Sequence, residues 1–316
     1  MMRKLTALSI FFILFFLKPC FGEEAVKNSP QYVGEFFGIK VPEKNHFFIK
    51  SALTVFGNRF GSQPKNAIEE EKCVWDQLLL SFEAFRRNIN VSQKDVDGEV
   101  LKILQADKVG FDRKKDPPAY EKWVKEKTGE PARVLEEQIR HFLQVEKLRA
   151  EIMESISAAV TIKEACREFM DERSMLSVEF VRFTEKKEAD KFYDSAKKNS
   201  RFWDKEKKKR PGDFKGMGAV SLVFLMDIWK FPRRAVYDMM RVKQGSIYPP
   251  ADVFEGYGVF KVLEQRVANK ADFAKSKAYY FAKVKRRKKY EGLNKWFEEL
   301  KKEANIKIYK EGMQNE

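Results

Sequence analysis

The spacing of apolar residues changes near Ser177, and this change constrains the fold more than any other feature. From residue 67 to 172, apolar residues recur every three or four positions, which is the period of amphipathic helices. The longest such stripe consists of Leu135, Ile139, Leu143, Leu148, Ile152 and Ile156. After Ser177 comes a short run of β-branched and aromatic residues, which favours a strand. The sequence therefore predicts four or five helices followed by a segment that contains strands.

The segment from 173 to 267 is expected to be an α+β insert. Strands are predicted at 177–183 and 257–263, helices at 185–198 and 232–240, and a polar, basic loop at 201–218. From 271 to about 302 the helical period returns, and Ile306 and Ile308 are compatible with a final short strand. A single terminal helix must bury its apolar stripe against another element. We therefore expect residues 268–316 to pack back on the helical module of residues 23–172, within which residues 23–66 look irregular because glycines and prolines interrupt them.

The first 22 residues have the pattern of an export signal. Arg3 and Lys4 precede 13 residues, 5–17, that contain nothing more polar than Thr and Ser. This stretch is short for a membrane-spanning helix, which needs about 20 apolar residues, and it suits a secretory signal. Cleavage is predicted after Gly22, which makes the protein exported or periplasmic. An uncleaved anchor and lipidation of Cys20 are the two alternatives.

Composition narrows the function classes. Apolar residues make up 43% of the 316 residues and 28 of them are Phe, so the chain is not a disordered one. Two His and three Cys are too few for a zinc site, and no phosphate-binding loop motif is present, so we expect no metal or cofactor, although these counts leave an ion site made only of carboxylates open. After cleavage, Cys73 and Cys166 either pair or are small buried residues, and burial is the favoured interpretation.

The net charge of +15 makes an anionic partner worth testing. Because an exported protein rarely meets nucleic acid, a nucleic-acid partner is not expected. The candidate contacts for an anionic membrane or polymer form a dense basic cluster on the last helix: Lys283, Lys285, Arg286, Arg287, Lys288 and Lys289.

Two stretches resemble the SurA/PrsA/PpiD class of exported folding factors. The stretch from Trp75 to Ser92, and later Glu137–Arg140 and Glu146–Arg149, are similar to the SurA N-terminal domain. The insert resembles a parvulin-type prolyl isomerase domain, most clearly at Val242–Ile247 and Gly256–Leu263. The resemblance covers roughly residues 67–310. It implies a mostly α protein in which a helical chaperone module, closed by a C-terminal helix, carries a parvulin-like domain.

The resemblance also implies a prolyl pocket with two His residues and a Cys or Asp. Carried onto this chain, the two His positions fall on Glu179 and Gly258, and the Cys or Asp region falls on Asp204 and Lys205. No His follows His141, so neither imidazole can be present. An isomerase must bind the twisted amide better than the planar one. We therefore expect a degenerate parvulin module without a catalytic set, although an unusual active site remains the alternative.

These observations predict an ATP-independent chaperone that binds non-native envelope or outer-membrane polypeptides in an apolar helical cleft. An active parvulin-type isomerase and a basic protein that binds anionic envelope surfaces are the alternatives. Many weak apolar contacts let clients dissociate without ATP. The candidate peptide-binding residues are aromatic or contain sulfur: Phe36, Phe37, Phe47, Phe48, Trp123, Phe231, Met239, Met240 and Tyr257. The oligomeric state is left open.

Overall fold

The computed structural model describes residues 31–60 and 64–309. The expected export signal and Cys20 lie outside the described residues. The chain divides into two compact units, Met1–Leu148 with Glu298–Glu316 and Arg149–Phe297. The unit boundaries fall inside two long helices, α5 (Ala132–Ser155) and α11 (Lys270–Ala304). Each unit is described by itself below.

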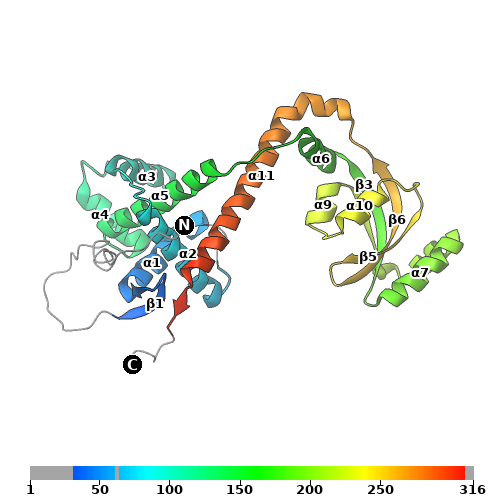
Figure 1. Ribbon diagram of the computed structural model, residues 1–316, viewed down its shortest axis with the longest axis horizontal. Helices are drawn as coiled ribbons and strands as arrows, with labels where there is room; N and C mark the ends of the chain where they lie inside the picture. The colour runs from blue at the N-terminus through cyan, green and yellow to red at the C-terminus, as the bar shows by residue number, and fades with distance from the viewer. Residues whose placement is uncertain (1–30, 61–63, 310–316) are drawn as a thin grey trace, which may run out of the picture. The chain divides into compact units, whose positions relative to one another are not determined.

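The first unit is mainly helical (Figure 1). Its helices are α1 (Glu43–Phe60), α2 (Ala67–Arg86), α3 (Gln93–Ala106), α4 (Pro117–Thr128) and most of α5. Side-chain caps begin three of them: Asn66 for α2, Ser92 for α3 and Asp116 for α4. Such caps satisfy backbone N–H groups that a helix start leaves unpaired. The helices share a core that includes Val96, Val124 and Ile139, each fully buried. The predicted helices of this region are therefore confirmed.

Residues 31–60 are regular, contrary to the expectation of irregular structure. They form β1 (Tyr32–Phe36), β2 (Ile39–Pro42) and α1. The sheet has the order β2-β1-β7, because β7 (Lys307–Ile308) pairs with the other side of β1. The backbone N–H of Phe37 also donates to the Ala304 carbonyl at 2.6 Å. The partner that orders this hairpin is thus about 270 residues away, and no local pattern could reveal it.

The second unit contains a four-stranded antiparallel sheet of order β4-β3-β6-β5. Its strands are β3 (Met175–Phe183), β4 (Phe214–Ser221), β5 (Ile247–Val253) and β6 (Gly256–Arg266). Its helices are α6 (Ile162–Arg173), α7 (Lys186–Lys198), α8 (Ser200–Lys209), α9 (Leu222–Asp227) and α10 (Arg233–Met239), with a 3-10 turn at Pro211–Asp213. A capping box formed by Thr161 and Glu164 begins α6.

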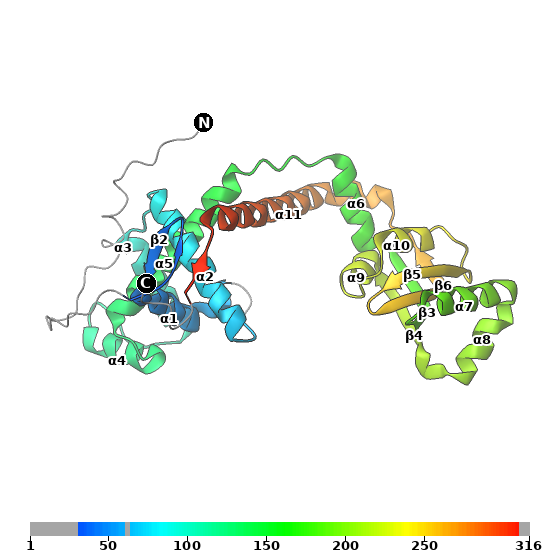
Figure 2. The ribbon, with the colours of Figure 1, turned by 60° about the horizontal axis from the view of Figure 1, so that its bottom comes forward.

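Helices cover both faces of this sheet, as Figure 2 shows. Val178 and Phe180 point from β3 into a core with α9 and α10. Val181, whose side chain alternates to the other face, packs with Phe192 of α7 and Trp203 of α8. A fold class of helices with an α+β insert is therefore confirmed.

The basic segment 201–218, expected to be a loop, is mostly α8 and β4. The reason is that contacts with residues far away in the sequence order this segment. Trp203 is fully buried under the sheet, and Met217 is buried in the opposite core. These two side chains anchor a segment whose remaining residues are mostly charged or glycine, which is why the composition alone indicated a loop.

In the second unit α11 packs on α6, which extends this unit beyond residues 173–267. Phe169 of α6 contacts Phe273 and Tyr280 of α11 in a small core of its own. Within the described residues, no helix is long and apolar enough to cross a membrane, and no group of three metal-ligating side chains occurs. Cys73 and Cys166 are free thiols, as the favoured interpretation expected, but each is only partly buried.

Candidate functional site

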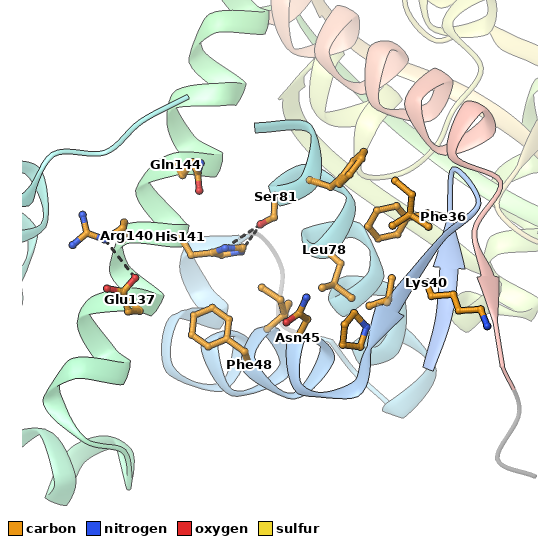
Figure 3. A pocket seen from close by; sticks show the side chains of 15 residues that line it. Phe36, Lys40, Asn45, Phe48, Leu78, Ser81, Glu137, Arg140, His141 and Gln144 are labelled. Carbon is orange, nitrogen blue, oxygen red and sulfur yellow. Dashed lines mark hydrogen bonds and ion pairs between the residues drawn. The ribbon is translucent and has the colours of Figure 1, made fainter. Parts of the chain in front are cut away.

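The first unit contains an apolar pocket of about 230 Å³ that is partly open to solvent. Five elements line it (Figure 3). They contribute Phe36 from β1; Ile39, Lys40, Val41 and Pro42 from β2; Asn45, Phe48 and Ile49 from α1; Leu78, Ser81 and Phe82 from α2; and Glu137, Arg140, His141 and Gln144 from α5. Sites for whole cofactors or small molecules span roughly 300–1,000 Å³. This pocket is smaller, and it suits one or two apolar side chains.

The hairpin creates the apolar end of the pocket. Phe36 packs edge-on against Phe82 of α2, with ring centroids 5.1 Å apart, and Phe37 lies 5.7 Å from the same ring. Phe36 is almost fully buried by this contact, whereas Phe82 stays half-buried. The turn between β1 and β2 thus holds the two phenylalanines on α2 and leaves part of Phe82 facing the cavity.

His141 forms the polar side of the pocket wall and carries no charge at neutral pH. Its Nδ1 and Nε2 lie 3.0 and 2.7 Å from the Ser81 hydroxyl oxygen, and its ring is 5.8 Å from that of Phe48. Burial lowers the pKa of His141 to about 4. Because both nitrogens face the same hydroxyl, neither is held by a carboxylate as in a catalytic triad. The pair keeps the wall neutral and suited to apolar groups.

The rim of the pocket is polar and is held in place by backbone contacts. Arg140 donates to the Val91 carbonyl at 3.1 Å and to Gln93 at 2.7 Å. Gln144 donates to the Ile89 carbonyl at 2.7 Å. Since the α2–α3 connection engages these side chains, they do not fold over the cavity. The pocket therefore keeps a polar entrance and an apolar interior.

The structure divides the peptide-binding candidates of the first unit into three groups. Phe36 and Phe48 line the pocket, and Phe37 supports it from behind through Phe82. Phe47 is 58% exposed on α1. Trp123 lies half-buried on α4, stacked on Tyr120 at 6.4 Å, in the helical core and not at the pocket. Only two of the five candidates thus lie at one site.

The candidates of the second unit belong mostly to its core. Phe231 and Met239 are 3% and 0% exposed beneath the sheet, so a peptide has no access to them in this conformation. Met240 is half-buried against the same core. Tyr257 is half-buried at the start of β6, against the other core. Phe231 and Met239 were predicted to bind peptide, but they pack in the core formed with α9 and α10.

Glu179, which stands at one of the expected imidazole positions, is engaged inside the fold. It is only 8% exposed and accepts hydrogen bonds from Trp203 Nε1 at 2.6 Å and from Lys207 Nζ. Both carboxylate oxygens are therefore occupied by donors of α8. Such a fixed group ties α8 to the sheet and is not available to a peptide.

The other three positions are no better placed for isomerisation. Asp204 pairs with Lys261 at 3.0 Å, and Lys205 is exposed on α8. Gly258 is buried in β6, where a Cβ atom would lie 2.7 Å from the Phe260 ring and 3.0 Å from Val253. The aromatic packing of the core therefore leaves no room for an imidazole at position 258.

The basic cluster on α11 is largely paired with acids of its own unit. Lys283 contacts Glu168 and Glu172, and Arg287 contacts Glu168. Lys288 pairs with Glu164 at 2.6 Å and Lys289 with Glu154 at 3.3 Å. Of the six residues of the cluster, all of which the structure describes, only Lys285 and Arg286 are exposed without an ion pair. Most of the cluster thus fastens α11 to α6 and to the end of α5.

Sequence reasoning missed most of the pocket. Leu78, Phe82 and His141 were not among the sequence candidates, because nothing in the sequence links them to the hairpin. The usable signals were the apolar run on both sides of Gly38 and the position of His141 beside Arg140. Neither signal says that β2 lies next to α5.

No protein-family model matches the sequence, and no curated protein matches it. Among solved structures, the chain is similar to a SurA-like chaperone of Campylobacter jejuni, with 11% identity over 88% of this chain and 99% of that chain and a TM-score of 0.39. It is also similar to the peptidylprolyl isomerase PrsA of Bacillus anthracis, with 17% identity over 75% and 97% and a TM-score of 0.41. PrsA of Bacillus cereus gives 12% identity over 90% and 96%, with a TM-score of 0.41. These are the classes that the sequence resembles.

Proposed function

We propose that this protein is an ATP-independent chaperone that shields apolar side chains of non-native polypeptides in the pocket of its first unit. The observation that carries the proposal is a neutral, apolar cavity that the folded chain leaves partly open. A folded domain normally closes such space with its own side chains. Apolar pockets that persist at a surface are typical of sites that bind other molecules.

The size and chemistry of the pocket favour weak, general binding. A cavity for one or two side chains contributes only a few kcal/mol of apolar contact, so each client segment dissociates readily. The polar rim offers hydrogen-bond partners without demanding one sequence. Clients that fit this pattern are unfolded chains with exposed aromatic or large aliphatic residues. Because the chain begins with an export-like segment, we propose envelope proteins as its clients.

The test is suppression of aggregation of an unfolded model protein by the mature chain and two variants. Phe48→Ser shortens a side chain of the pocket, and Phe47→Ser makes the same change at an exposed neighbour on α1. We expect Phe48→Ser to lose most of the suppression, while Phe47→Ser keeps nearly all of it. Circular dichroism of both variants checks that the first unit stays folded.

Two outcomes contradict the proposal. One is the absence of suppression by the wild-type chain at equimolar concentration. The other is equal loss in both variants, because exposed aromatic residues and not the pocket would then be what clients bind.

A further inference from the structure

One wall of the pocket is also the free edge of a sheet. Among the strands that the structure describes, the order is β2-β1-β7, so β2 has a partner on one side only, and β2 contributes four residues to the pocket lining. Edge strands present unpaired backbone N–H and C=O groups that another extended chain can bind. The question is whether this edge offers such groups beside the cavity.

The turn fixes which backbone groups point outward. Phe37 and Gly38 have φ values of 53° and 73°, the left-handed pair of a two-residue type I′ turn. In such a hairpin the flanking residues, Phe36 and Ile39, form the first hydrogen-bonded pair. Hydrogen-bonded and non-bonded pairs then alternate along an antiparallel ladder. Glu35 and Lys40 are the next pair in the register, so Lys40 directs its N–H and C=O away from β1.

The opposite side of β1 gives the same result independently. The N–H of Tyr309 donates to the Val33 carbonyl at 2.9 Å, so Val33 faces β7. Two residues further, Glu35 faces β7 as well, because backbone direction alternates along a strand. Glu35 therefore cannot bond to Lys40 across the hairpin. Among the described residues, no turn, cap or loop backbone hydrogen bond involves Lys40 either.

The side chains next to this backbone group alternate between two faces. Ile39, Lys40 and Val41 all line the cavity, but side chains alternate along a strand, so Ile39 and Val41 share one face of β2 and the Lys40 side chain lies on the other, where its Nζ is 5.3 Å from the Tyr32 ring. Figure 3 shows the Lys40 side chain extending away from the other residues of the pocket. A strand added beside β2 would thus send alternate side chains into the pocket and the residue between them toward Lys40.

The face that carries Lys40 has an excess of positive charge. Glu35, which lies across the hairpin from Lys40, accepts from Lys307 Nζ at 2.6 Å and from the Tyr309 hydroxyl at 3.0 Å. The Glu35 carboxylate is thus the acidic partner near both Lys40 and Lys307, and its hydrogen bond goes to Lys307. Opposite charges on directly facing residues stabilise a strand pair, and like charges destabilise it.

We propose that the edge of β2 binds an extended client segment as an added antiparallel strand, in which an acidic residue faces Lys40 and the apolar residues on either side of it enter the pocket. This proposal rests on the chaperone function above and names its substrate class. The bound residue opposite Lys40 would exchange two backbone hydrogen bonds with it. A helical client cannot make these bonds, so the site selects chains that are still unfolded.

The experiment uses the mature chain and a fluorescently labelled peptide, Ser-Thr-Phe-Glu-Phe-Thr-Ser, with fluorescence anisotropy as the readout. A second peptide carries N-methyl-glutamate at the centre, which removes one backbone donor and keeps the side chains. A third replaces the central Glu by Lys. We expect the loss of the donor to weaken binding roughly fivefold, and the Lys peptide to bind several-fold more weakly than the Glu peptide.

A charge exchange then tests the register. Lys40 is exposed, so Lys40→Glu should fold, and this variant should prefer the Lys peptide over the Glu peptide. Lys44→Glu is the matched control, since Lys44 is also exposed but belongs to α1 and not to the edge strand. It should keep the wild-type preference.

Three results overturn the proposal while the chaperone function stands, provided that the aggregation assay still shows suppression. They are equal affinity of the N-methyl peptide, an unchanged preference in Lys40→Glu, and no peptide binding. Dimerisation of the wild type that Lys40→Glu abolishes also overturns it, since the edge would then belong to a second copy. Loss of both peptide binding and suppression contradicts both proposals.

Discussion

The two units use the same residue type, phenylalanine, in opposite ways. In the first unit, the ring centroids of Phe36 and Phe82 lie 5.1 Å apart, and a pocket of about 230 Å³ remains beside the two rings. In the second unit, Phe180, Phe231 and Phe260 meet at 4.9 to 5.7 Å, and all three are 5% exposed or less. An aromatic cluster becomes a core when helices close over it, as α9 and α10 do, and a pocket when a short hairpin covers only part of it.

This difference bears on function. The closed unit resembles a domain associated with catalysis, yet its expected catalytic positions hold a bonded glutamate and a glycine without room for a side chain. The open unit offers the cavity. We therefore propose that clients bind to the unit whose packing is incomplete.

The largest expected effect tests the closed core against the open pocket with the same substitution. Phe260→Ala removes a fully buried ring and should cost about 4 kcal/mol of unfolding free energy. Phe82→Ala removes a half-buried ring beside existing space and should cost about 1 kcal/mol. Denaturant unfolding followed by circular dichroism measures both. Equal costs would mean that the pocket is packed as tightly as the core.

The next prediction concerns the imidazole positions. Gly258→His should destabilise the second unit by about 3 kcal/mol, because Phe260 and Val253 already occupy the space. Gly216→His is the control, since nothing lies within 4 Å of a Cβ at this exposed position of β4. Neither variant should accelerate proline isomerisation in a protease-coupled peptide assay, and neither should the wild type. A saturable wild-type rate would restore the isomerase alternative.

The third prediction is that the free energy of unfolding of the first unit, which contains both histidines, depends on pH. The folded pKa of His141, about 4, is below its ordinary value of 6.5 because burial disfavours the charged form. The unfolded chain therefore takes up a proton first, and stability falls as the pH drops from 6.5 toward 4. Between pH 7 and pH 5 the loss should be about 2 kcal/mol. His141→Gln should remove this part of the slope, and an unchanged slope would show that another group causes it.

The smallest effect concerns the basic cluster of the second unit. Burial by itself would raise the pKa of Glu168, but hydrogen bonds and charge from Arg287 and Lys283 hold that pKa below its usual value. Glu168→Gln should cost about 1 kcal/mol in a thermal or denaturant melt. The double change Lys285→Gln and Arg286→Gln should leave stability unchanged. If the double change lowers stability more than Glu168→Gln does, contacts other than the Glu168 ion pairs hold α11 in place.

Local patterns predicted many of the elements of both units. The helices of residues 67–173 follow from apolar spacing and from caps such as Ser92 and Thr161, because both signals act within one or two turns of chain. The strands β3 and β6 follow from β-branched and aromatic runs. Segments 31–60 and 201–218 were misjudged, since their order depends on β7 and on the burial of Trp203, which are distant contacts.

The sequence by itself determined the fold class, the helices of residues 67–173, the strands β3 and β6, and the lack of His after position 141, since these depend on local spacing and residue identity. Only the tertiary structure decided which aromatic residues meet at a cavity and which ones fill a core. Phe36 and Met239 are both apolar side chains in short apolar runs. What differs is the element packed opposite each, and that is set by pairing between residues far apart in the chain.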